Sequence, residues 1–266
     1  MGRISLDAAM LRALAGKRDV VDAARELLPE AAALAVVPVS GFRVGAIAVD
    51  SDGRAWFGAN QEFADVALGQ TVHAEQSAIA HAWMGGATQI VHMVVTHAPC
   101  GHCRQFMSEL HGADALSIHL PALDMAFADY LPGRFGPADL GIVAGLLHPV
   151  HCPLQAEATD AVAQAALDAA QHSHAPYSGA HAGFALRTHD GRMFSGRYAE
   201  NAAYNPSLPA LQCALNLLHL HGARASDIAE GVLVYEEGQG HAQHTQALWR
   251  AITDAPLRLL IAKAAA

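Results

Sequence analysis

Two short segments of the chain carry side chains that bind transition metals. They read His73-Ala74-Glu75 and Pro99-Cys100-Gly101-His102-Cys103. One imidazole and two thiols are ligands that zinc prefers, and Glu75 adds a carboxylate that need not be a ligand. A zinc site with three protein ligands keeps a position open for water, which is typical of catalytic sites. The pattern therefore predicts one catalytic zinc ion bound by His73, Cys100 and Cys103.

The expected surroundings of these ligands favour metal binding. Cys100 should lie just after a strand and at a helix start, where free N–H groups and the helix dipole stabilise a thiolate. Two thiolates, one neutral imidazole and Zn²⁺ sum to zero charge, so the metal can still lower the pKa of its bound water. Glu75 follows His73 by two residues, and we expect it to shuttle protons beside the metal.

The elements that must position these residues alternate between helices and strands. Hydrophobic spacing predicts two short helices within residues 6–37, and strands at 44–49 and 55–57 around the turn signal Ser51-Asp52-Gly53. A helix over residues 71–84 should carry His73 and Glu75 near its start. A buried strand is predicted at 90–96, and Pro99 should open a second helix. This order favours a layered α/β fold.

Residues 38–62 are repeated at 176–200. Nine of 25 aligned positions are identical without a gap, where unrelated sequences share about one or two. The identities include Gly45 with Gly183, Gly58 with Gly196, and Glu62 with Glu200. We therefore expect two copies of one fold unit with a boundary near 149–157, rather than two unrelated domains that share a glycine-rich hairpin.

The second copy lacks the residues of the metal motif. Gln76-Ser77-Ala78 resembles Gln212-Cys213-Ala214, which sets Pro209 opposite His73 and Leu211 opposite Glu75. No cysteine follows Cys213. The second copy is therefore expected to be structural and to have lost the chemistry.

Parts of the motif have other interpretations when they are taken alone. His-x-Glu is a weak signal in a chain with 17 histidines, and Cys-x-x-Cys also occurs in redox pairs and structural zinc sites. The order of the two halves and the missing fourth ligand favour the catalytic site. His102 is expected to point away from the metal, because neighbouring side chains on a helix diverge. Arg104 is expected either to donate to a ligand thiolate or to form a surface salt bridge.

Composition argues against several classes of protein. The chain of 266 residues has 16 Lys and Arg against 25 Asp and Glu, a net charge of −9, and no basic run, which argues against a nucleic-acid partner. No apolar stretch is long enough to predict a membrane span, and the first residues lack the features of a signal peptide. We therefore expect a cytoplasmic protein in which Cys152 and Cys213 are buried thiols.

The sequence resembles the two-domain, homodimeric bacterial cytidine deaminases over nearly all of its length after about residue 30. The order His-x-Glu, then Pro-Cys-x-x-Cys, is the signature of zinc-dependent nucleobase deaminases. The matching segments lie at residues 36–47, 57–63, 71–79, 99–107, 130–137 and 198–209. The resemblance implies a duplicated α/β fold, a mixed sheet with helices on both faces, after a helical segment at 1–37. The catalytic domain would cover residues 38–150, and the degenerate copy residues 155–266.

The resemblance also implies a reaction. It is the hydrolytic deamination of cytidine and 2′-deoxycytidine to uridine and 2′-deoxyuridine, a step of pyrimidine salvage, with one zinc ion per chain. Zinc-bound hydroxide would attack C4 of the ring. Glu75 would take the proton of that water, protonate N3, and later pass a proton to the departing amine.

The resemblance further implies a set of substrate-binding residues. Phe42 would pack on the pyrimidine ring, although plain core packing is the alternative. Asn60 and Glu62 would bind the ribose hydroxyls, although a role in the turn alone is the alternative. The remaining members of the set are Gln61, Ala74 and, reaching into the site of the neighbouring subunit, Phe135 together with the segment around 198–204. His97 stands where the family has a tyrosine, a change expected to affect only affinity.

Two other functions remain open at this point. The same zinc chemistry could act on a nucleotide or on a base of a polynucleotide, but the net charge of −9 and Glu62 argue against a phosphate-bearing substrate. A zinc-stabilised binding module without turnover would not need Glu75. Replacing Glu75 by Gln separates these interpretations, because only an enzyme would lose its activity while zinc is retained.

Overall fold

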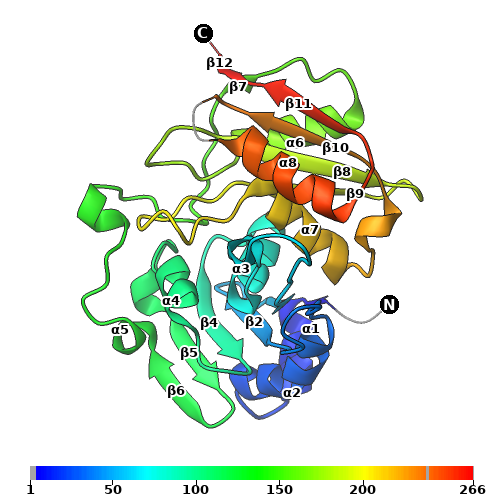
Figure 1. The fold of residues 1–266 in the computed structure, drawn as a ribbon. Helices are drawn as coiled ribbons and strands as arrows, with labels where there is room; N and C mark the ends of the chain where they lie inside the picture. The colour runs from blue at the N-terminus through cyan, green and yellow to red at the C-terminus, as the bar shows by residue number, and fades with distance from the viewer. Residues whose placement is uncertain (1–3, 238–239, 266) are drawn as a thin grey trace. The chain divides into compact units, whose positions relative to one another are not determined.

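The computed structural model describes residues 4–237 and 240–265 (Figure 1). Residues 1–3, 238–239 and 266, which belong to the predicted segments 1–37 and 155–266, lie outside the described residues. The described chain divides into two compact units. The first contains the residues up to Glu62, Thr71–His148 and Asn201–Pro206, and the second contains Phe63–Gln70, Pro149–Glu200 and the residues from Ser207 onward.

The first unit is built on a six-stranded mixed sheet. The strand order is β1-β3-β2-β4-β5-β6, with β4 and β5 parallel and the other neighbours antiparallel. Its elements are β1 (Ser5–Leu6), α1 (Ala8–Ala15), α2 (Val20–Ala33), β2 (Gly45–Asp50), β3 (Ala55–Ala59), α3 (Ala74–Met84), β4 (Ile90–Val95), α4 (Gly101–Met107), β5 (Ser117–Leu120), β6 (Leu123–Ala126) and α5 (Phe127–Tyr130).

The second unit repeats the central part of this arrangement. Its four-stranded sheet has the order β11-β10-β8-β9, and β10 and β11 are the parallel pair. Its elements are β7 (Leu154–Gln155), α6 (Ala161–Gln171), β8 (Ala182–Thr188), β9 (Met193–Arg197), α7 (Ala210–Leu220), β10 (Ile228–Tyr235), α8 (His241–Ile252), β11 (Leu257–Ile261) and β12 (Lys263–Ala264), which pairs with β7. The prediction of a duplicated mixed sheet is thus confirmed.

Glycines shared by the two copies let helices pack closely on both faces of each sheet. A Cβ atom at Gly45 would lie 2.4 Å from the backbone N of Ala32 in α2, and one at Gly58 would lie 2.2 Å from that of Ala78 in α3. Successive residues of a strand point to opposite faces of the sheet, whereas residues paired across two strands point to the same face. Gly45 and Gly58 are not paired, since Gly45 pairs with Ala59, so α2 and α3 cover opposite faces. Gly183 and Gly196 meet α6 and α7 in the same way.

Two helix starts differ from their predicted positions. The helix predicted from residue 71 begins at Ala74, because the backbone of Val72 is extended and pairs with Gln61. The helix expected to open at Pro99 begins at Gly101, with Cys100 as its N-cap residue. Both shifts place a metal-binding side chain at the N-cap position.

Candidate metal centre and substrate pocket

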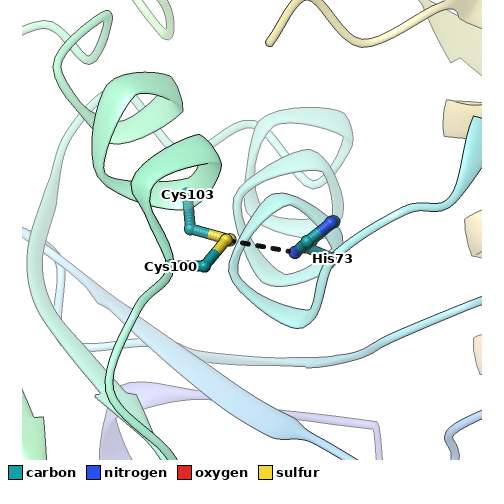
Figure 2. Close-up of side chains that lie close together, drawn as sticks. All are labelled: His73, Cys100 and Cys103. Atoms are coloured by element: carbon teal, nitrogen blue, oxygen red, sulfur yellow. Dashed lines mark hydrogen bonds between the residues drawn. The ribbon is translucent and has the colours of Figure 1, made fainter. Parts of the chain in front are cut away.

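The three predicted metal ligands lie at the starts of two helices of the first unit. His73 is the N-cap residue of α3, Cys100 is the N-cap residue of α4, and Cys103 lies in the first turn of α4. Figure 2 shows the three side chains pointing toward one another. Cys100 is exposed whereas Cys103 is buried, so the group lies at the boundary between the core and a hollow of the surface.

Two of the three distances between the ligand atoms fit a tetrahedral zinc ion, and all three atoms lie within 4.8 Å of one another. Nδ1 of His73 lies 3.5 Å from Sγ of Cys100, and the two sulfurs lie 3.6 Å apart. Tetrahedral zinc with ordinary bond lengths separates a nitrogen from a sulfur by about 3.6 Å and two sulfurs by about 3.8 Å. Among the described residues this is the group of histidine, cysteine or carboxylate side chains that could hold a metal ion. The donors present therefore fit Zn²⁺.

Without a bound metal, the two thiols have pKa values shifted in opposite directions. The contact with the Cys103 thiol lowers the pKa of Cys100 to about 4, against the effect of burial. Backbone N–H groups of Cys103 and His102 contribute to the same shift. The contact with Cys100, burial and the nearby Glu75 raise the pKa of Cys103, so metal binding must displace its proton. The lowered pKa agrees with the thiolate predicted at Cys100, and the contact with Cys103 contributes more to it than the backbone N–H groups at the helix start.

Glu75 lies directly beside the metal ligands without being part of the donor triangle. It is 4% exposed, and its Oε2 lies 3.1 Å from Sγ of Cys103. Burial raises the pKa of Glu75, although the hydrogen bond from Cys103 opposes the shift. A raised pKa makes this carboxyl easier to protonate than an ordinary glutamate, which suits a group that both accepts and donates a proton.

His102 and Arg104 differ from what was expected of them. His102 does not point away into solvent: its half-buried ring stacks on that of His73, with centroids 4.8 Å apart. Arg104 donates to the carbonyl oxygens of Pro99 and Tyr130 rather than to a thiolate. Its guanidinium also lies over the Tyr130 ring, so it fixes the loop that ends at Cys100 through backbone contacts.

A cavity of about 300 Å³ opens onto the metal ligands and Glu75. This size is at the lower end of the range for pockets that hold small molecules. The lining residues all belong to the first unit: Ser40, Phe42, Val44, Asn60, Glu62, Thr71, His73, Ala74, Glu75, His97, Ala98, Cys100 and Cys103. The cavity thus brings together most of the residues that were predicted from two separate parts of the chain.

Phe42 and His97 form an aromatic pair in the wall of the cavity. Their ring centroids are 4.7 Å apart. Phe42 is 54% exposed, which rules out plain core packing, whereas its counterpart in the second copy, Ala180, is 5% exposed. Nδ1 of His97 lies 3.0 Å from Oγ1 of Thr96, which holds the imidazole in place.

Asn60 and Glu62 line the cavity, but both are also bonded to the loop before β2. Asn60 accepts from the N–H of Val44 and donates to the carbonyl of Phe42, both at 2.9 Å. Glu62 accepts from the N–H groups of Val39 and Ser40, both at 2.9 Å, and from the hydroxyl of Ser40.

The second copy keeps the same carboxylate bonds. Glu200 accepts from the N–H groups of Tyr177 and Ser178 and from the hydroxyl of Ser178. Because this copy lacks the metal ligands, the shared glutamate has a structural role in the loop in addition to any contact with substrate.

Two other predicted residues lie outside the cavity lining. The side chain of Gln61 is 2% exposed, and its backbone forms an isolated bridge with Val72. Phe135 is 46% exposed, and its carbonyl accepts from Nε2 of Gln105 at 2.8 Å. The structure describes one chain, so it leaves the expected contact of Phe135 with a neighbouring subunit as a prediction.

Two residues of the site, Ser40 and Gln76, were not predicted from the motifs. The serine is one of the repeated positions, with Ser178 as its counterpart, and Gln76 has the repeated counterpart Gln212. Oε1 of Gln76 accepts from the N–H of His73 at 3.2 Å. Their identity between the copy that has the metal ligands and the copy that lacks them was the signal that could have indicated a structural role.

Comparison with known proteins agrees with this site. Two family models, both described as the cytidine and deoxycytidylate deaminase zinc-binding region, match residues 21–119 and 127–248. Both copies therefore match the class of zinc-binding deaminases, and the donor set that fits zinc lies in the first copy.

Individual relatives narrow the class. Cytidine deaminases of Yersinia pestis (strain Pestoides F) and Yersinia pseudotuberculosis serotype IB (strain PB1/+) are each 51% identical over 216 residues, which is 81% of this chain and 72% of theirs. A cytidine deaminase crystal structure from Mycobacterium tuberculosis is 36% identical and covers 42% of this chain and 94% of that one, with a TM-score of 0.39. The chain belongs to the cytidine deaminase family. In the part of the chain described, no helix is long and apolar enough to cross a membrane.

Proposed function

We propose that this chain hydrolyses cytidine and 2′-deoxycytidine to uridine and 2′-deoxyuridine, as a step of pyrimidine salvage. The observation that carries the proposal is the position of Glu75, a buried carboxyl with a raised pKa that touches a zinc-fitting donor triangle at the base of a cavity. The relatives at 51% identity, named cytidine deaminases, supply the substrate class.

His73, Cys100 and Cys103 would hold the zinc ion, and zinc in such a site supplies a water molecule of lowered pKa. Glu75 would accept a proton of that water and pass it to N3 of the ring. The C–O bond would then form at C4. Glu75 would carry the remaining proton of the added hydroxyl to the amino group as the C4–N bond breaks and ammonia leaves, which gives the C4 carbonyl of the product. Oε2 of Glu75 lies 3.1 Å from Sγ of Cys103, which places the carboxyl beside the proposed zinc site. From there it could reach N3 and the amino group of the bound ring.

The cavity wall would orient the nucleoside. The exposed ring of Phe42 offers a flat apolar surface to the pyrimidine, and Ala74 leaves room beside it. The ribose hydroxyls would meet Asn60 and Glu62, whose hydrogen bonds to the loop already fix their side chains. Gln61, which lies between Asn60 and Glu62 in the sequence and is buried, would help to hold these two residues in place. A carboxylate at the sugar disfavours a substrate that carries phosphate.

We also propose the assembly and the roles of the two copies. Residues 38–150, with the helical segment 1–37, would be catalytic, and residues 155–266 would be the non-catalytic copy. A homodimer is proposed in which Phe135 completes the partner's site, as its 46% exposure allows. Arg104 would position the Cys100 loop. The four cysteines are free thiols, as expected in the reducing cytoplasm, the proposed location.

Turnover of cytidine, followed by the loss of its ultraviolet absorbance, tests the proposal. Glu75→Gln should lower kcat by about 10²- to 10⁴-fold while zinc content stays at one ion per chain. Removal of zinc by a chelator should abolish turnover, and added zinc should restore it. Zinc-loaded, folded protein without activity on either nucleoside would refute the assignment.

A further inference from the structure

A segment of the second copy completes the first unit. Residues Asn201–Pro206, here called the strap, belong to the first unit although the residues on either side of them belong to the second. The strap is bonded to both of the helices that begin at metal ligands, and the contacts lie away from the cavity.

One end of the strap is bonded to α4, the helix that contains Cys103, and to the residues just after it. Nδ2 of Asn201 donates to the carbonyl of Gln105 at 2.9 Å, and Nε2 of Gln105 donates to Oδ1 of Asn201 at 3.3 Å. The N–H of Ala202 donates to Oε2 of Glu109 at 2.9 Å. Asn201 and Glu109 are each 0% exposed, so these bonds are shielded from water. Gln105 is two residues from Cys103, which ties this end of the strap to the thiol pair.

The other end of the strap is fixed to α3 through Gln76. Nε2 of Gln76 donates to the carbonyl of Pro206 at 3.1 Å, while Oε1 accepts from the N–H of His73 at 3.2 Å. Gln76 is 2% exposed. One buried amide therefore connects the backbone of a metal ligand to the strap.

We propose that the strap is a positioning element that holds His73 at a fixed distance from the Cys100–Cys103 pair. This proposal rests on the assignment of these three residues as the zinc ligands. Zinc tolerates departures of only about 0.2 Å in its bond lengths, so the relative position of the two helix starts matters for binding. A buried amide left without its partner is unfavourable, so loss of the bond favours a shift of the two helix starts away from each other.

The second unit supplies a matched control. There α7, the counterpart of α3, carries Gln212, whose Nε2 lies 2.5 Å from Oε1 of Gln70. Gln70 belongs to Phe63–Gln70, the segment of the first copy that is part of the second unit. The bond takes the corresponding place in the second unit, although its acceptor is a side-chain amide rather than a backbone carbonyl. The helix α7 begins after Pro209 and carries no metal ligand.

The test compares Gln76→Ala with Gln212→Ala in the full chain. Zinc release to excess chelator is measured together with the urea midpoint of unfolding. We expect Gln76→Ala to lose zinc about tenfold faster or more, and Gln212→Ala to stay within about twofold of the wild type, at similar losses of stability. Asn201→Ala, at the α4 end of the strap, should behave like Gln76→Ala.

Other results would overturn the proposal. Equal acceleration of zinc release in Gln76→Ala and Gln212→Ala would show a general loss of stability, and no acceleration would show that the strap does not position the ligands. Failure of Gln76→Ala and Asn201→Ala to fold, while Gln212→Ala folds, would show a role in folding instead. Zinc that stays bound in a His73→Ala control would refute the ligand assignment separately.

Discussion

Replacing Gly58 by alanine should move the start of α3 and weaken zinc binding. The added Cβ would lie 2.2 Å from the backbone N of Ala78 and 2.5 Å from the carbonyl O of Ala74. Both contacts are with helix backbone, so a side-chain rotation cannot relieve them. To reach a contact of 3.4 Å, α3 must retreat by about 1.2 Å. That shift exceeds the tolerance of about 0.2 Å for zinc bond lengths, and His73 directly precedes the helix.

Gly196→Ala provides the matched comparison in the second copy. Its Cβ would lie 2.3 Å from the carbonyl O of Ala210 and from the backbone N of Ala214, a clash of the same kind against α7. Overpacking of this sort costs about 1–3 kcal/mol, so both variants should lower the free energy of unfolding by similar amounts. Only Gly58→Ala should lower zinc affinity, by about tenfold or more.

The assay combines urea unfolding with a competition titration of zinc against a chromogenic chelator. Turnover at saturating zinc then separates lost metal from a distorted site, and Gly58→Ala should remain slow even when it is zinc-loaded. The reasoning would be refuted if Gly58→Ala kept wild-type zinc affinity and stability. It would also be refuted if Gly196→Ala weakened zinc binding equally.

Three further outcomes are expected. His102→Ala should weaken zinc binding by roughly 0.5–1.5 kcal/mol, because the ring contact with His73 is lost. His102→Phe should restore zinc binding. A chelator titration in which His102→Phe binds zinc as weakly as His102→Ala would contradict the stacking argument. Burial lowers the pKa of His219 to about 4, so the unfolded chain takes up a proton first and stability should fall by about 2 kcal/mol between pH 7 and pH 5. Urea unfolding of His219→Leu should show a smaller fall, and an unchanged one would argue against this histidine. The hydrogen bond from Arg258 lowers the pKa of Asp160 to about 2. The ionised carboxylate therefore stabilises the fold at pH values above the ordinary aspartate pKa, and this stabilisation is lost as the pH falls toward 2. Arg258→Gln should therefore move acid unfolding, followed by circular dichroism, to higher pH, and an unmoved transition would count against the pair.

Much of the site could be predicted because its chemistry lies in short motifs. His73, Glu75 and the two cysteines are close in sequence to helix starts, and the structure brings them together as expected. The repeat of glycines indicated the duplication, since only glycine allows a helix backbone so near a strand.

Features that depend on distant segments could not be predicted. The stacking of His102 follows from how α3 and α4 approach each other, which spacing within one helix cannot specify. Arg104 bonds backbone carbonyls, and carbonyls carry no sequence signal. Glu62 has a structural role that became visible only when the bonds of Glu200 were compared with its own.

Residues 201–206 also set the order in which the protein is completed during synthesis. About 50 residues separate the strap from His148, where the main part of the first unit ends. At an elongation rate of about 5–20 residues per second this interval lasts about 3–10 s. In that period the nascent chain already carries the histidine and both thiols, but Gln76 lacks its partner at Pro206. A ribosome-bound chain therefore gains its full capacity to retain metal only after about half of the second copy has been translated.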